Sequence, residues 1–170
     1  MINLLILYEL NKKVLTMYGI SANIKSEFSV LMLPSIGTIK PALKKMEMSG
    51  FITAQKYMSK GGRPSTYYAI TQQGKLALNE ELLSALPENP IQFLTNARIR
   101  LYCADVLDNT NLAVMLRMLK RKSEVLMTET GKRLDNEGMT FYPKMVFDNL
   151  TCEYRNFYSL LEGIEHACKH

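Results

Sequence analysis

Basic and hydroxyl side chains gather in one short segment of the chain, residues 35–50, with the sequence SIGTIKPALKKMEMSG. Lysine ammonium groups bind phosphate oxygens, and threonine and lysine also form hydrogen bonds with base edges in the major groove of DNA. The residues in this segment that can do this chemistry are Ser35, Thr38, Lys40, Lys44 and Lys45. The pattern predicts a contact with double-stranded DNA, and the alternative is a solvated face without a partner.

Those side chains need a helix that presents them on one side. Apolar residues recur at spacings of three and four, as on the buried face of an amphipathic helix, at Ile36, Ile39, Leu43 and Met46. Ser35 is a suitable N-cap, and Gly50 stands where a left-handed C-terminal cap is favoured. Because a proline inside a helix costs about 3 kcal/mol, we expect one helix with a local distortion at Pro41. A helix that begins afresh at Pro41 is the alternative.

A β-hairpin is predicted directly after this helix. Its parts are an alternating strand at 51–58, a turn-rich tip at 59–65 and a β-branched and aromatic strand at 66–70. Lys60 and Arg63 at the tip suit contacts with phosphates or the minor groove, although surface hairpins often carry such charges without a partner. Tyr67 and Tyr68 point to opposite sides of the strand, so at most one contacts DNA and the other is core. We select Tyr67 as the contact.

The other segments are helical by pattern. The predicted helices are 2–10, for which a strand is the alternative, 17–28, 72–85 after the N-cap Thr71, 91–107, 112–134 and a last helix that begins near Pro143. The strongest break is Pro87-Glu88-Asn89-Pro90, so we predict one domain at 1–86 and a second at 91–170. The fold class is mainly α with a small β-hairpin. Three helices, a hairpin and a helix in the first domain have the order of a winged helix-turn-helix.

The last predicted helix carries a long apolar stripe with spacings of three and four. Its members are Val146, Leu150, Tyr154, Phe157, Leu161 and Ile164. Such a stripe can seat a partner helix as in a coiled coil, so we predict a helical dimerisation domain with this stripe at the homodimer interface. The alternative is that the stripe packs against other helices of the same chain, and we expect that some of it does.

Charge divides the chain in the same way as the predicted domains. The formal net charge is +5, with nine Lys and one Arg against four Glu in residues 1–80, a net of +6, and eleven basic against twelve acidic residues in 81–170, a net of −1. A basic part joined to a neutral part indicates that the first binds a polyanion and the second has another task.

Several classes of function lack their motifs here. The sequence has no Gly-rich phosphate loop, H-E-x-x-H or G-x-S-x-G motif, so we expect neither an enzyme nor a cofactor. His166 and His170 form no set with cysteine or acidic ligands, and no metal site is expected. No run reaches the ~20 apolar residues of a membrane span, and three unpaired cysteines suit a reducing compartment, so we expect a cytoplasmic protein. The cysteines are expected to be small buried residues, with a thiol sensor as the alternative for one of them.

Three segments closely resemble the PadR-like transcriptional regulators: residues 15–20, residues 35–47 and residues 61–74, the last with the sequence GGRPSTYYAITQQG. The resemblance implies a winged helix followed by a helical region that makes most of a homodimer interface, and hence a DNA-binding repressor. It also implies a phosphate contact for Tyr18, for which a place in the core is the alternative. The chain departs from the family pattern at Thr16-Met17, where His-Gly is common, and at Lys40, where Tyr is usual.

The combined hypothesis is a homodimeric repressor that binds an inverted-repeat operator, because a dimer places two recognition helices about one helical turn apart. A small hydrophobic effector is a further expectation, since the chain has surfaces rich in Met and aromatic residues that can repack around a planar ligand. Residues of this kind are Phe93, Tyr102, Met115 and Met118, and core packing is their alternative role. The chain has no Trp with which to stack such a ligand. The alternative function is a winged-helix protein-interaction module without DNA binding.

Overall fold

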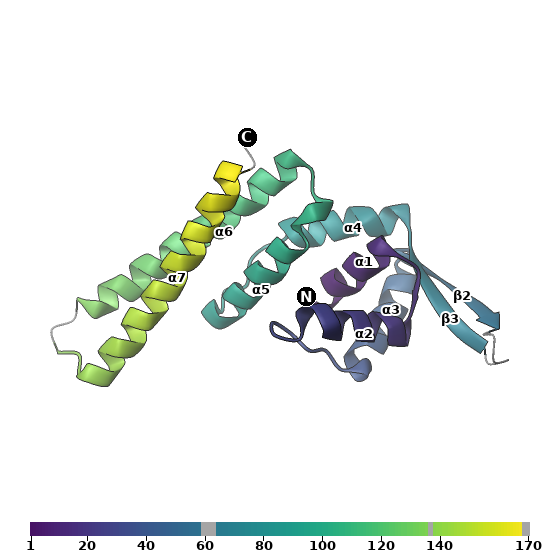
Figure 1. The fold of residues 1–170 in the computed structure, drawn as a ribbon, viewed down its shortest axis with the longest axis horizontal. Helices are drawn as coiled ribbons and strands as arrows, with labels where there is room; N and C mark the ends of the chain where they lie inside the picture. The colour runs from purple at the N-terminus through teal and green to yellow at the C-terminus, as the bar shows by residue number, and fades with distance from the viewer. Residues whose placement is uncertain (59–63, 136–137, 168–170) are drawn as a thin grey trace. The chain divides into compact units, whose positions relative to one another are not determined.

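The computed structural model describes residues 1–58, 64–135 and 138–167 (Figure 1). The chain forms two compact units, Met1–Val106 and Leu107–His170. Among the described residues the fold is mainly helical, with one small antiparallel sheet, and the first unit has the winged helix-turn-helix arrangement expected from the order of its elements.

Three helices form the centre of the first unit. Helix α1 (Ile2–Lys12) is apolar nearly all round and is buried from Leu4 to Leu10, so the strand alternative for this segment was wrong. Helix α2 (Met17–Phe28) buries one side, through Ile20, Ile24 and Phe28. Helix α3 (Ile36–Met48) is continuous through Pro41, so no new helix begins at this residue, and a distortion there stays a prediction.

The sheet has three strands, β1 (Leu15–Thr16), β2 (Ile52–Met58) and β3 (Pro64–Ile70), in the antiparallel order β1-β3-β2. The β2–β3 hairpin is the wing, and in Figure 1 it extends away from the helices of its unit. Ile52 pairs with Ile70 and Ala54 with Tyr68. Strand β1 was not predicted, because two residues are too short to show the alternation by which a strand is recognised from sequence.

Helices α4 (Gln72–Leu83) and α5 (Pro90–Tyr102) follow the wing, and a short 3-10 helix, η1 (Ala104–Val106), ends the first unit. The break predicted at residues 87–90 therefore lies inside this unit, and the compact division comes after Val106. The break serves as a cap: the Asn89 side chain accepts hydrogen bonds from two backbone amides in the first turn of α5, at 3.0 and 3.2 Å. Arg100 of α5 then donates to carbonyl oxygens at the end of α4, including those of Leu82 (3.0 Å) and Ser84 (2.7 Å).

The second unit is an antiparallel pair of long helices, α6 (Asn109–Leu134) and α7 (Phe141–Ala167), which lie side by side in Figure 1. Their seam combines apolar residues such as Leu126 and Phe157 with a buried hydroxyl pair, in which Thr151 Oγ1 donates to Thr130 Oγ1 at 2.9 Å. Helix α7 begins two residues before Pro143. Proline is tolerated there because the first amides of a helix have no intrahelical acceptor.

Candidate nucleic-acid interface

The start of α3 presents two hydroxyl groups to solvent. Ser35 is the N-cap, and its Oγ accepts a hydrogen bond from the backbone amide of Thr38 at 3.3 Å. The hydroxyl oxygens of Ser35 and Thr38 lie 3.1 Å apart and form a second hydrogen bond. The two predicted contacts therefore lie together at the exposed beginning of the helix, where the positive end of the helix dipole favours a phosphate.

The two faces of α3 differ as the sequence indicated. Ile39, Leu43 and Met46 are almost completely buried, whereas Lys40, Lys44 and Lys45 are exposed. In the described part of the chain, none of these three lysines forms an ion pair. Ile36, predicted on the apolar stripe, lies in the first turn and is 37% exposed, so the stripe is fully buried only from Ile39 onward.

The end of α3 is locked to the base of the wing. Gly50 has φ +73°, and the amides of Gly50 and Phe51 donate to the carbonyl oxygens of Glu47 and Met46, both at 3.0 Å, which is the Schellman cap. Thr71 Oγ1 lies 2.7 Å from the Gly50 carbonyl oxygen. These contacts confirm the predicted glycine cap and tie Phe51, the residue before β2, to the last turn of α3.

Close packing continues from this cap into α4. The Thr71 side chain is the N-cap of α4 and accepts a hydrogen bond from the Gly74 amide at 3.0 Å. A Cβ atom on Gly74 would lie 2.0 Å from the Phe51 carbonyl oxygen, so only glycine fits without a shift of the backbone. Helix α3, the wing and α4 are therefore fixed to one another at a single junction.

A cleft of about 300 Å³ lies between the first turn of α2, the middle of α3 and strand β3. Tyr18, Lys40 and Tyr68 contribute to its walls, together with Thr66 of the wing. Tyr18 is 70% exposed, so its alternative as a core residue was wrong, while its contact with a phosphate stays a prediction. The cleft joins Tyr18 to the lysine surface of α3, although the two residues are far apart in the sequence.

The two neighbouring tyrosines of β3 lie on opposite faces of the sheet. Tyr67 packs edge to face against Tyr57 of β2, with ring centroids 5.8 Å apart, beside Gln55, which accepts a hydrogen bond from the Tyr57 hydroxyl. Tyr68 lies on the other face, in the cleft with Lys40, where burial and then the charge of Glu47 raise the pKa of its phenol. The structure therefore groups Tyr68 with the predicted α3 contacts and separates Tyr67 from them, and the DNA contact of Tyr67 stays a prediction.

From sequence, Tyr68 was assigned to the core in favour of Tyr67, and Lys56 was not named as a member of this surface. Lys56 is exposed on β2 and pairs with Thr66, and it lies on the same face of the sheet as Tyr68 because it is two residues from Ala54, the partner of Tyr68. Counting alternate residues from buried Ile52 gives Lys56, and counting back two residues from Ile70, the partner of Ile52, gives Tyr68. Lys60 and Arg63, the predicted contacts at the tip of the wing, lie outside the described residues.

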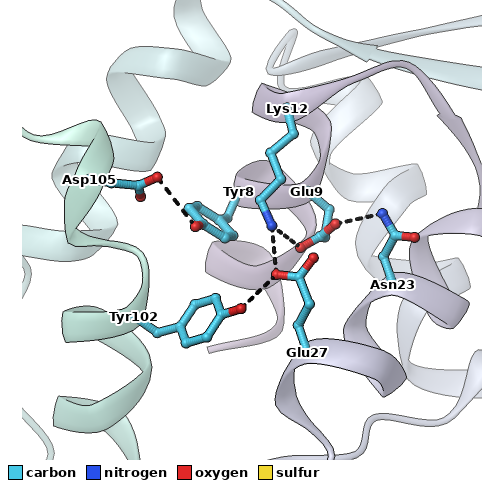
Figure 2. A network of polar contacts seen from close by, with 7 residues as sticks. All are labelled: Tyr8, Glu9, Lys12, Asn23, Glu27, Tyr102 and Asp105. Atoms are coloured by element: carbon cyan, nitrogen blue, oxygen red, sulfur yellow. Dashed lines mark hydrogen bonds and ion pairs between the residues drawn. The ribbon is translucent and has the colours of Figure 1, made fainter.

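A polar network connects α2 with α1 and α5 in the first unit (Figure 2). Glu9 is completely buried, and its carboxylate accepts hydrogen bonds from Lys12 Nζ at 3.0 Å and from Asn23 Nδ2 at 2.8 Å. Lys12 Nζ also donates to Glu27 Oε2 at 2.6 Å, and the Tyr102 hydroxyl donates to the same oxygen at 3.1 Å. The network therefore holds α2, which carries Tyr18 at its opposite end.

Burial and charge set the ionisation of this network. Burial disfavours the charged form of Lys12, but hydrogen bonds to Glu27 and Glu9 outweigh it and raise the pKa of the ammonium group. Burial also raises the pKa of the Tyr8 phenol, whose hydroxyl lies 3.5 Å from Asp105 Oδ2. Cys103, completely buried nearby, has its thiol pKa raised by burial, which disfavours the reactive thiolate.

The apolar stripe of α7 is divided between the interior and the surface. Tyr154, Phe157 and Leu161 are buried in the single chain, Leu150 and Ile164 are half-buried, and Val146 is 58% exposed. Three other exposed apolar residues precede Val146 at the start of α7, namely Phe141, Tyr142 and Met145. Of the Met and aromatic residues considered for an effector, Phe93 and Met115 are core, Met118 is half-buried and Tyr102 belongs to the polar network.

Neither a metal site nor a membrane-spanning helix is found among the described residues. Among residues 1–58, 64–135 and 138–167, no group of three or more His, Cys, Asp and Glu side chains is placed to hold a metal ion. Within the same ranges, no helix is both long enough and apolar enough to span a membrane. Cys152 is half-buried, and Cys168 and His170 lie outside the described residues.

Comparison with known proteins gives one family. The model of the transcriptional regulator PadR-like family matches residues 6–80. A PadR family transcription regulator from Clostridium difficile R20291 is 32% identical over 45% of this chain and 78% of that chain, with a TM-score of 0.41. Bacillus subtilis PadR in complex with operator DNA is 22% identical over 95% and 94% of the two chains, with a TM-score of 0.47. The same Bacillus subtilis protein in complex with p-coumaric acid is 21% identical over 99% of this chain and 95% of that chain, with a TM-score of 0.41. No curated protein sequence matches the chain.

Proposed function

Because the chain belongs to the PadR-like family of transcriptional regulators, we propose that it is a cytoplasmic repressor that binds an inverted-repeat operator as a homodimer. The observation that carries this proposal is the composition of α3, which has a buried apolar back and a front of three exposed lysines without ion pairs in the described part of the chain. Unpaired cations on one helix face repel one another and contribute little to the fold, so a polyanionic partner best accounts for them.

We assign the contacts by position on α3. The first residues of a recognition helix reach base edges in the major groove, so Thr38 and Lys40 read bases, with Ser35 holding the Thr38 hydroxyl. Lys44 and Lys45 follow one turn later and bind phosphates, as do Tyr18 and the predicted wing residues Lys60 and Arg63. Lys40 is suited to the acceptor pair of a guanine, which gives this chain a base preference different from that of a relative with Tyr at the same place.

The proposed DNA surface can be tested by selecting bound fragments of genomic DNA and measuring operator affinity as a function of salt. Lys44→Ala and Arg63→Ala should each weaken binding and reduce the slope of log affinity against log salt by about 0.9, the effect of one phosphate contact. Lys75→Ala is the matched control, because Lys75 is an exposed lysine on α4. Unchanged affinity and slope in both variants would exclude this helix and wing as the DNA surface. The absence of any sequence-specific binding would favour the protein-interaction module instead.

The dimer is proposed to form through the exposed part of the α7 stripe, since Tyr154, Phe157 and Leu161 are already buried in one chain. Val146→Glu places a charge in the exposed apolar surface at the start of α7 and should convert a dimer into a monomer, as measured by light scattering at micromolar concentration. Val125→Glu is the control, because Val125 is 43% exposed on α6. A monomeric wild-type protein would refute this part of the proposal.

We also propose that a small hydrophobic effector releases the repressor from its operator. An effector of this kind must bind the released state more tightly than the DNA-bound state, because equal affinity for both would shift nothing. The test is to measure operator affinity with and without candidate ligands. An operator affinity that no ligand changes would leave the DNA-binding proposal intact and remove this regulatory part.

A further inference from the structure

A second cleft, of about 500 Å³, lies on the first unit away from α3. It is bounded by the start of α1, the connection between α2 and α3, and the first turns of α5. Its apolar walls include Met1, Met32 and Ile91, and its polar groups belong to Gln92, Thr95 and Asn96. Sites for small molecules are typically about 300–1,000 Å³, mostly apolar, with a few polar groups that orient the ligand.

Asn96 is the unusual member of this cleft. Its side chain is only 8% exposed, and within the described residues its Oδ1 atom is buried without a hydrogen-bond partner. Among the described residues, its Nδ2 atom donates only to the sulfur of Met1, at 3.8 Å, which is a weak acceptor. A buried carbonyl without a donor is costly, and such groups in folded proteins normally have a partner. The amide of Asn96 therefore lacks a strong partner on both sides.

The lining also restricts the charge of a ligand. Besides the α-ammonium group of Met1, none of the residues that line the cleft carries an ionisable group. A cation would therefore be desolvated there without a compensating group, and a carboxylate would offer no hydrogen-bond donor to Asn96 Oδ1. The Met1 side chain that covers the Asn96 amide is unbranched and flexible, and a ligand can displace it and replace the weak N–H···S contact. The ligand best suited to the uncovered amide offers an N–H donor for Oδ1 beside an acceptor for Nδ2.

We propose that this cleft binds a small neutral molecule with an apolar body and an amide-like edge, and that its occupation alters operator binding through the α2–α3 connection. Met32 lies in that connection, three residues before the N-cap Ser35 of the recognition helix. The regulatory half of this inference rests on the repressor function proposed above, whereas ligand binding can be tested without DNA.

Benzamide is a suitable probe, and N,N-dimethylbenzamide, which has no N–H donor, is its matched control. Titration into the full-length protein should give saturable shifts of the Met32 and Ile91 methyl resonances, with dimethylbenzamide binding about tenfold more weakly, since it leaves Asn96 Oδ1 unpaired. Asn96→Leu should remove this difference between the probes. Unsaturable shifts, equal binding of both probes to the wild type, or tighter binding of benzoate than of benzamide would overturn the proposal.

Substitutions at the mouth of the cleft and a concentration series without a probe test whether benzamide binds in this cleft. Ile91 is 80% exposed, so Ile91→Glu should fold normally and weaken benzamide binding at least about fivefold through the charge placed at the mouth of the apolar cleft. Leu76→Glu, at an exposed position of α4, should leave benzamide binding unchanged.

Methyl shifts that follow protein concentration without a probe would show that a second copy covers the cleft, which overturns the proposal. Saturable binding that leaves operator affinity unchanged would overturn its regulatory half, while operator binding without any probe tests the proposed function separately.

Discussion

Lys12 and Lys44 belong to the same compact unit but have opposite surroundings. The ammonium group of Lys12 lies 3.0 Å from Glu9 and 2.6 Å from Glu27, and it also lies over the Tyr8 ring, 4.2 Å from the centroid. Lys44 is exposed on α3 and has no ion pair among the residues that the structure describes. One lysine neutralises a carboxylate that is completely buried, and the other adds positive charge to a surface that already carries Lys40 and Lys45.

This difference separates two uses of the same residue type. A cation that neutralises a buried carboxylate stabilises the fold, because the carboxylate would otherwise be left unpaired in the interior. An exposed cation beside others of the same sign contributes almost nothing to folding. Removing Lys12 should therefore change stability, and removing Lys44 should change only what the surface binds.

Lys12→Met should lower the free energy of unfolding by about 2–3 kcal/mol, less than for a fully buried ion pair, because water screens a lysine side chain that is 33% exposed. The reason is that the Glu9 side chain is 0% exposed and would keep only its hydrogen bond from Asn23. Urea denaturation followed by circular dichroism gives the measurement. Lys44→Met is the control and should stay within about 0.5 kcal/mol of the wild type. Equal losses in the two variants would remove the distinction between the lysines.

Gly74→Ala tests whether operator binding by the exposed face of α3 depends on the close packing of α3, the wing and α4 behind it. A Cβ at this position meets the Phe51 carbonyl oxygen at 2.0 Å, so the junction of α3, the wing and α4 must shift, at a cost of about 2 kcal/mol. Operator affinity should fall as well, although Gly74 itself is buried. Gly131→Ala is the matched control in α6, where a Cβ meets nothing within 4 Å, and it should raise stability by about 0.5–1 kcal/mol. Similar effects of the two substitutions would show that this junction is not tightly packed.

Ser35→Ala should cost about 1 kcal/mol of stability, the usual loss for an N-cap hydroxyl. It should also weaken operator binding, because the Thr38 hydroxyl loses the partner that holds it at 3.1 Å. Ser26→Ala, at an exposed position within α2, is the control and should leave both quantities nearly unchanged. A loss of stability without a loss of operator affinity would restrict Ser35 to a structural role.

The features predicted from sequence are those with local causes. The ends of α3 were predicted because Ser35 and Gly50 act on backbone groups only a few residues away, and its buried face because Ile39, Leu43 and Met46 follow the period of one helix. The general order of helices and wing followed from the same local patterns. No knowledge of the rest of the chain was needed for these elements.

Features that depend on distant partners were missed. The cleft that joins Tyr18 to Lys40 exists only because β3 and α3 pack beside α2. Helix α5 packs in the first unit through contacts such as the hydrogen bond from Tyr102 to Glu27, two residues that are 75 positions apart in the sequence. The sequence shows charged and aromatic residues at these positions, but no period or short motif pairs them.

The smallest effect is expected at alkaline pH, and it returns to the network around Lys12. Burial raises the pKa of Tyr8 in the folded chain above its unfolded value of about 10. The folded state therefore retains a proton that the unfolded state releases, so the contribution of Tyr8 to stability is present below about pH 10 and is lost as pH rises further. At pH 10 about half of the unfolded tyrosine is ionised, which corresponds to a loss of about 0.4 kcal/mol.

Tyr8→Phe should lose less stability than the wild type between pH 8 and pH 10, by about this amount, when both are compared by urea denaturation. Because Lys12 also has a raised pKa, part of the alkaline sensitivity should persist in Tyr8→Phe and fall further when Lys12→Met is added. If the wild type and Tyr8→Phe lose stability in parallel, Tyr8 is not part of the network that distinguishes Lys12 from Lys44.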